Sequence, residues 1–211
     1  MGLDWLPGNK AKPEHEQEFD RLWRDLHSKV CLWRKRKEAR LEAISITPFD
    51  TLEAPEVGKD ASADAWIRAK YPSRKDQSLT ESQWVERFRG FRVVELVEPC
   101  DGLPRYTNGC AGEYVEAFAF RGQFLRDCDY IIGTELLNSA FDAKLPKQTI
   151  SYGQSLIGRA QEFAATRAIN LVTASEVDDP DAPEFHADVV ISAGRWCVYW
   201  GERGHWLNPW F

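Results

Sequence analysis

FHADVVISAGRWCVYWGERGHW, residues 185–206, is the stretch that decides the fold. Its β-branched and aromatic residues lie on both sides of Ala193 and Gly194, a pattern typical of two strands joined by a tight turn. Successive side chains of a strand point to opposite faces, and both faces of the second run would be apolar or aromatic. We therefore expect a C-terminal β-hairpin covered on both sides, with hairpin and tail together spanning residues 184–211.

The tail itself, GERGHWLNPWF at residues 201–211, is rich in tryptophan. Trp206 and Trp210 stand four residues apart with a proline between them, which is too broken a pattern for a long helix. We expect the tail to pack back over the sheet as a lid. The alternative is that Trp206 and Trp210 form an aromatic surface for a ligand or a partner, because tryptophan is enriched at binding hot spots.

Residues 13–44 carry the clearest helical pattern. Pro13 suits a first helical turn, acidic residues follow it, and lysine and arginine crowd the far end, as the helix dipole favours. Apolar side chains recur every three or four residues on one face: Phe19, Leu22, Trp23, Leu26, Val30 and Trp33. The sequence predicts one long amphipathic helix over 13–44, whose apolar stripe would cover the protein's own sheet or complete a homodimer.

Proline and polar residues divide the next part of the chain. Residues 45–62 are rich in proline, aspartate and serine and predict a connector. A short helix that Pro72 stops comes next, followed by a helix that begins with a capping box at Thr80 and Gln83. Residues 91–98 alternate well enough to predict a strand.

Two further ranges, 123–142 and 149–169, have the periodicity of helices. Together with the hairpin, the predicted elements are several helices packed on a small antiparallel sheet. This pattern predicts a single α+β domain that spans residues 1–211.

Composition and charge exclude several function classes. The chain of 211 residues carries 27 lysines and arginines against 33 aspartates and glutamates, a net charge of −6, so we expect no nucleic-acid partner. No run approaches the roughly 18 apolar residues of a membrane span, so we expect no membrane partner. The five cysteines are odd in number and widely spaced, which favours a reducing, cytoplasmic location. The basic run RKRK at 34–37 fits a solvated helix face, or a contact with an acidic partner or a phosphate.

The loop 99–112 is the first candidate site, because long irregular loops on a compact scaffold often carry function. In it, Cys110 precedes a possible helix that starts near Gly112. A thiol at a helix N-terminus has a lowered pKa, as a nucleophile needs, although glycines around a cysteine are also common in plain turns. The other candidate residues of this segment are Arg105, Tyr106, Glu113 and Glu116.

A cysteine nucleophile needs a base, and His186 and His205 are the candidates. On a strand, His186 and Asp188 would share one face, which suits a metal pair or an oriented histidine. A metal site needs three or four ligands, and the sequence offers no such set, so we expect no metal and no cofactor.

These observations rank three functions. We expect first a binding or interaction domain for a small molecule or a protein, using the loop 99–112 and the aromatic tail. The alternative is a cysteine-dependent hydrolase or transferase with Cys110 as nucleophile and His186 or His205 as base. A weaker alternative is a metal-dependent hydrolase.

Overall fold

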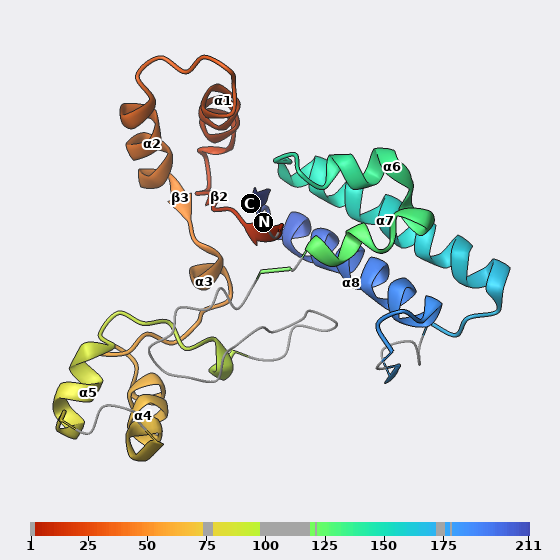
Figure 1. The fold of residues 1–211 in the computed structure, drawn as a ribbon. Coiled ribbons are helices and arrows are strands. Elements are labelled where there is room, and N and C mark those ends of the chain that lie inside the picture. Colours follow the sequence, from red (N-terminus) through yellow and green to blue (C-terminus); the bar gives the residue numbers. More distant parts are fainter. Residues whose placement is uncertain (1–2, 74–77, 98–118, 121, 172–175, 178) are drawn as a thin grey trace. The chain divides into compact units, whose positions relative to one another are not determined.

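The computed structural model describes residues 3–73, 78–97, 119–120, 122–171, 176–177 and 179–211 (Figure 1). The chain divides into two compact units, and each is described by itself. The first contains residues 3–46 and 119–211, and the second contains residues 47–97. Helices predominate, with two short antiparallel strand pairs, so the α+β class predicted from the sequence is confirmed. The prediction of a single domain stays a prediction.

The first unit is built on two long helices, α7 (Pro146–Arg167) and α8 (Pro183–Glu202). Their backbones approach so closely that neither has room for a side chain at the crossing. A Cβ atom on Gly153 would lie 2.6 Å from the carbonyl oxygen of Gly194, and one on Gly201 would lie 2.6 Å from a side-chain carbon of Ile150. Glycine therefore stands where the two helices touch.

The predicted hairpin at residues 184–211 is wrong, because residues 185–202 belong to the single helix α8. Gly194 is a contact glycine in the middle of the helix rather than a turn residue. Helix α8 is buried on more than one side, so apolar residues are not confined to one face of it. Without that helical contrast, its β-branched and aromatic residues resemble strands. Its start carries ordinary helix signals, with Pro183 in the first turn and Glu184 after it.

Two short antiparallel pairs lie beside these helices. Strand β1 (Asp4–Pro7) pairs with β4 (Leu207–Trp210), and β2 (Lys10–Ala11) pairs with β3 (Ser45–Ile46). Asp4 is opposite Trp210, so the two ends of the described chain lie side by side (Figure 1). We expected the tail to form a lid over the sheet; instead, its residues Leu207–Trp210 form a strand of the sheet.

Trp5 of β1 lies in the core of this unit. Its indole is fully buried, and its ring centroid lies 5.3 Å from that of Phe120, 5.8 Å from that of Tyr152 and 5.9 Å from that of Trp196. Its Nε1–H donates a hydrogen bond of 2.9 Å to the carbonyl of Ala140. A buried tryptophan with its donor satisfied stabilises the core through its large apolar area.

The helix predicted over 123–142 is present in two pieces, the 3₁₀ turn η3 (Gly122–Arg126) and α6 (Asp129–Ser139). Gly133 bends α6 with a φ of 78°, a conformation that glycine adopts without strain. The buried side chain of Lys144 follows α6, and its Nζ donates to the carbonyls of Ser139 and Asp142. Burial lowers the pKa of Lys144.

The long helix predicted over 13–44 is wrong in its middle: α1 (Glu16–Leu26) and α2 (Arg34–Ala43) are separate helices. The Ser28 hydroxyl, which has one proton to donate, lies 2.6 Å from the carbonyl oxygen of Asp25 and 2.8 Å from that of Val30, and Trp33 adopts a left-handed φ of 62°. Serine competes in this way with helical hydrogen bonds, which ends α1. The first part of the predicted apolar stripe is buried as expected: Phe19, Leu22, Trp23 and Leu26.

The second unit consists of short helices. They are α3 (Pro48–Thr51), α4 (Ala61–Lys70), η1 (Tyr71–Ser73), α5 (Glu81–Arg87) and η2 (Val94–Leu96). The connector predicted at 45–62 therefore contains β3 and α3 and ends at the start of α4.

The capping box predicted at Thr80 and Gln83 is confirmed at the start of α5. The core of this unit is the buried set Val57, Ala63, Ile67, Trp84, Phe88 and Val93.

The strand predicted at 91–98 is wrong, since only Arg92 forms a bridge, with Glu56, and a 3₁₀ turn follows. The Arg92 side chain also binds Asp50 and the carbonyl of Ala54, and the backbone N–H groups of Val57 and Val93 donate to the carbonyls of Phe91 and Pro55, so the pairing is short and the arginine reinforces it.

The α7–α8 contact yields a stability prediction. Gly153→Ala introduces a methyl group against the Gly194 carbonyl, so we expect a loss of about 2 kcal/mol or more in the free energy of unfolding. Gly158→Ala on the same helix is the control. Its Cβ would meet nothing within 4 Å, so the replacement should stabilise the protein by about 0.5–1 kcal/mol. Urea denaturation followed by circular dichroism measures both, and equal effects would contradict the close approach.

Candidate functional site

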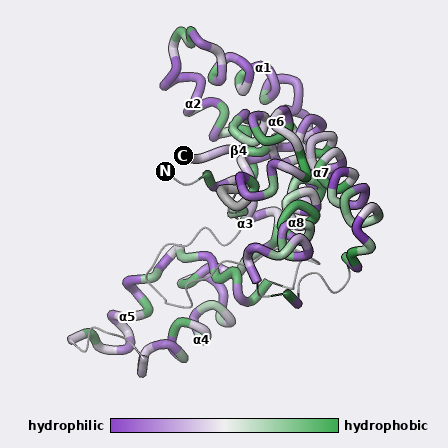
Figure 2. Tube along the Cα trace, turned by 45° about the vertical axis from the view of Figure 1, so that its right-hand side comes forward, coloured by the Kyte–Doolittle hydropathy of each residue, from purple (hydrophilic) through white to green (hydrophobic). Residues whose placement is uncertain are grey.

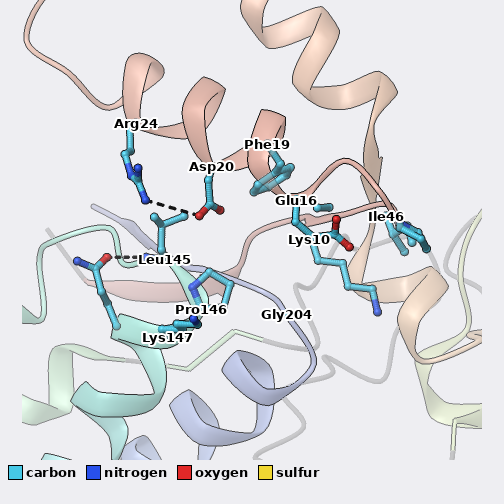
Figure 3. Close-up of a pocket in the computed structure, with 13 residues that line it drawn as sticks. Lys10, Glu16, Phe19, Asp20, Arg24, Ile46, Leu145, Pro146, Lys147 and Gly204 are labelled. Atoms are coloured by element: carbon cyan, nitrogen blue, oxygen red, sulfur yellow. Dashed lines mark hydrogen bonds and ion pairs between the residues drawn. The ribbon is translucent and has the colours of Figure 1, made fainter.

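A cavity of about 710 Å³ opens between α1, the first turn of α7 and the strand pair β2–β3 (Figure 3). This volume lies within the range of sites that hold small ligands. Its lining residues come from the first unit: Lys10, Ala11, Pro13, Glu16, Phe19, Asp20, Arg24, Ile46, Leu145, Pro146, Lys147, Gln148 and Gly204.

The apolar wall of the cavity belongs to a packed cluster. Phe19 and Leu145 are buried in the same small core, which also holds Ile44. Ile46 and Pro146 extend this wall as half-buried residues. In Figure 3, Phe19 comes from α1, Ile46 from β3, and Leu145 and Pro146 from the start of α7. A rigid apolar wall built on helices and strands suits the apolar body of a ligand.

The rim of the cavity is charged. Arg24 forms an ion pair of 3.6 Å with Asp20 one turn earlier on α1, and this pair is solvent-exposed. Lys10, Lys147 and Glu16 also line the cavity, and none of the three makes an ion pair with the residues that the structure describes. Three cations and two carboxylates thus surround the opening.

The first turn of α7 faces the cavity. Pro146 is its first residue, and the Leu145 backbone N–H donates to the side chain of Gln148, which caps this end. By helix geometry, the backbone N–H groups of Lys147 and Gln148 have no acceptor within the helix. They add the partial positive charge of a helix N-terminus to the two lysines of the rim.

Trp206, one of the predicted binding residues, packs next to this wall. Its ring lies against Gly8 so closely that a Cβ atom there would fall 2.0 Å from the indole. It also makes edge contacts with Trp23, at 5.5 Å between centroids, and with His27, at 5.1 Å. The other tail tryptophan, Trp210, is exposed on β4. The structure does not bring these two rings together as one aromatic surface.

His205, a predicted base, is fully buried just beyond the C-terminal end of α8. Its Nδ1–H donates a hydrogen bond of 2.7 Å to the carbonyl of Gly8, and its ring stands perpendicular to that of Trp200. Burial is the main reason why its pKa falls to about 4, and the nearby cations Lys10 and Arg203 lower it further. A neutral histidine at this position joins the N-terminal segment to the end of α8.

His186, the other predicted base, lies on the first turns of α8. Its Nδ1 is hydrogen-bonded at 2.8 Å to the hydroxyl of Tyr130 from α6. The expectation that His186 and Asp188 share a face is wrong, because residues two apart on a helix point to nearly opposite sides. Burial raises the pKa of Asp188, and Arg195 opposes that effect.

Burial disfavours the thiolate form of the two thiols that the structure describes in the core. Burial raises the pKa of Cys128 to about 12 and also raises that of Cys197. A reactive cysteine needs the opposite shift. The predicted nucleophile Cys110 lies outside the described residues, as does the whole loop 99–112. The same holds for the other candidates of that segment, Arg105, Tyr106, Glu113 and Glu116. The enzyme hypotheses stay predictions.

Within the described part of the chain, no three histidine, cysteine or acidic side chains gather as a metal site would require. The same residues contain no helix long and apolar enough to cross a membrane. Comparison of the chain with protein-family models, with curated proteins and with solved structures finds no match.

No pattern in the sequence indicates the whole cavity, because its residues come from segments far apart in the chain. No local spacing connects Lys10, Phe19 and Lys147, because the fold alone brings them to one place. One signal was available: Pro146 suits the first position of a helix, and free N–H groups at such a start attract anions.

The buried histidine yields a pH prediction. The folded pKa of His205 lies below its unfolded value of about 6.5, so its contribution to stability is complete above pH 6.5. That contribution is lost as the pH falls toward 4, and the loss amounts to about 3 kcal/mol over this window. Urea denaturation at pH 7, 5.5 and 4 measures it. His205→Asn should be less stable at pH 7 yet lose much less between pH 7 and pH 4, and an unchanged pH slope would contradict the assignment.

Proposed function

We propose that this protein is a binding domain whose cavity between α1 and the start of α7 takes a small amphipathic acid. The observation that carries the proposal is the cavity of about 710 Å³, in which an apolar wall meets a charged rim. Ligand sites of this size are typically apolar with a few polar groups that fix orientation. A binding domain is also the function that the sequence favours, although its site lies elsewhere than the predicted loop and tail.

The charges of the rim support an anionic head group. Lys10 and Lys147 line the cavity without ion pairs among the described residues, and the N-terminal end of α7 faces the same space. Of the two carboxylates, Asp20 is already paired with Arg24. Glu16 lies in the first turn of α1, where the dipole of that helix compensates its charge. Lys10 of β2 and Lys147 of α7 are therefore the cations that remain for a ligand.

The apolar wall supports an apolar body for the same ligand. Phe19 and Leu145 are fixed by packing, which means that the wall is formed before a ligand arrives. A preformed wall reduces the ordering cost of binding.

A fluorescence titration with 8-anilinonaphthalene-1-sulfonate, an aromatic probe with one anionic group, tests the proposal. We expect saturable binding of one probe per chain. Lys147→Glu should weaken it about fivefold or more, because a charge-assisted contact contributes about 1–3 kcal/mol. Lys10→Glu should act in the same direction.

Arg126→Glu provides the matched control, since it reverses an exposed charge of the same unit that does not line the cavity. This probe also binds partly unfolded proteins, so each variant must retain a cooperative unfolding transition. Equal weakening by Arg126→Glu would show that net charge alone attracts the probe. Unsaturable binding would overturn the cavity as the site.

A further inference from the structure

The turn between α1 and α2 exposes three large apolar side chains. Val30 and Trp33 are each 78% exposed, and Leu32 is 70% exposed. In the tube of Figure 2, the α1–α2 pair is mostly hydrophilic, with hydrophobic colour at the connecting turn. Scattered exposed apolar residues are ordinary on a protein surface, but three of them within four positions form a patch that water disfavours.

The backbone of this apolar tip, residues 30–33, is also strained. Trp33 has a φ of 62°, a left-handed conformation that costs a non-glycine residue free energy. Glycine or asparagine would occupy such a position without this cost, and either would remove the exposed indole. The chain therefore holds a tryptophan at a place where neither burial nor backbone conformation favours it.

Cations surround the apolar tip. Lys29 precedes it, and the basic run at 34–37 follows it, with no acidic residue between positions 29 and 37. Lys29, Lys35 and Arg36 make no ion pair with the residues that the structure describes. The whole chain has a net charge of −6, so this positive surface is local.

The attachment of α2 leaves these cations facing outward. No residue of α2 is buried, and polar contacts tie the helix to α1. Arg40 donates two hydrogen bonds to Glu18, at 2.8 and 2.7 Å, and Lys37 pairs with Asp25 at 2.6 Å. The basic residues that these contacts do not use lie beside the apolar tip.

We propose that the α1–α2 turn binds the surface of an anionic lipid bilayer. Its apolar tip enters the interface, and the cations around it contact lipid phosphates. Tryptophan is enriched at the level of lipid headgroups, and basic residues are attracted to anionic leaflets. This proposal departs from the expectation of no membrane partner, which rested on the lack of a membrane-spanning run. The described helices contain no membrane span, but binding at the surface needs only an amphipathic face.

Two features favour a lipid surface over a macromolecular partner. The α1–α2 turn forms the end of a helical hairpin, opposite the end that joins β2 and β3 (Figure 1), and its three large apolar side chains are exposed to solvent. Valine and leucine at such an end suit hydrocarbon and offer nothing to the phosphates or base edges of a nucleic acid. The local positive charge on an acidic chain supplies the complementarity to anionic headgroups.

Co-sedimentation of the full chain with vesicles tests the proposal. One set of vesicles is phosphatidylcholine alone, and a second contains about one-third phosphatidylglycerol, which gives a negative surface. We expect binding to the second set only, and we expect it to weaken as salt is added, because salt screens the contact.

Two variants separate the contributions. Trp33→Gly should reduce vesicle binding about tenfold, since a large apolar side chain no longer enters the interface. It should keep a melting temperature at or above that of the unchanged protein, because glycine relieves the left-handed strain. Lys35→Glu combined with Arg36→Glu should reduce binding at least about tenfold.

Each variant has a matched control. Trp210→Ser removes an exposed tryptophan from β4, away from the turn. Arg87→Glu combined with Arg126→Glu changes the net charge by the same amount as the double variant and alters two other exposed arginines. Both controls should bind the anionic vesicles as the unchanged protein does.

Three outcomes would overturn the proposal. One is the absence of binding to anionic vesicles. Another is equal binding to neutral vesicles. The third is a loss of binding in the controls as large as in the turn variants. Analytical ultracentrifugation supplies a further check: if the protein ignores vesicles but self-associates, and Trp33→Gly abolishes the self-association, the turn contacts a second copy of the chain instead.

Discussion

The close approach of α7 and α8 is the constraint on which the first unit depends. Three glycines remove the side chains where the helices cross, so that backbone atoms of one helix contact the other directly. This proximity leaves the remaining sides of α8 free to bury Trp196 and Trp200 in the core. The tryptophans are therefore core residues because the glycines set the distance between the helices. Dispersion contacts over such a long interface are individually small and large in sum.

The end of α8 determines where the cavity forms. His205 donates a hydrogen bond to the Gly8 carbonyl of the N-terminal segment, and the Trp206 ring lies against the same glycine. Two residues later along that segment, Lys10 starts β2 and reaches the cavity rim. A buried neutral histidine at the end of one helix thus fixes the strand that supplies one wall of the cavity. The cavity is a consequence of how the N-terminal and C-terminal segments meet.

The sequence predicted the elements whose signals are local. The capping box at Thr80 of α5 depends only on spacing within that helix, as does the buried stripe from Phe19 to Leu26 of α1. Both are present. The hairpin prediction failed because periodicity reports contrast between faces, and a helix buried on several sides has little contrast. Gly194 has the same sequence signature as a turn glycine, although its role is packing. The cavity was out of reach because its residues converge only through the tertiary fold.

The way in which α2 is attached has a consequence for the dynamics of the chain. Helix α2 has no fully buried residue: its half-buried Leu41 packs against the apolar cluster of Phe19, Leu22 and Trp23, and partly exposed ion pairs join it to α1. Such ion pairs contribute modestly and weaken as ionic strength rises. Local opening of α2 therefore requires much less free energy than unfolding of the α7–α8 pair. Its backbone amides would exchange with solvent long before those of the core, so α2 can detach and reattach while the rest of its unit stays folded.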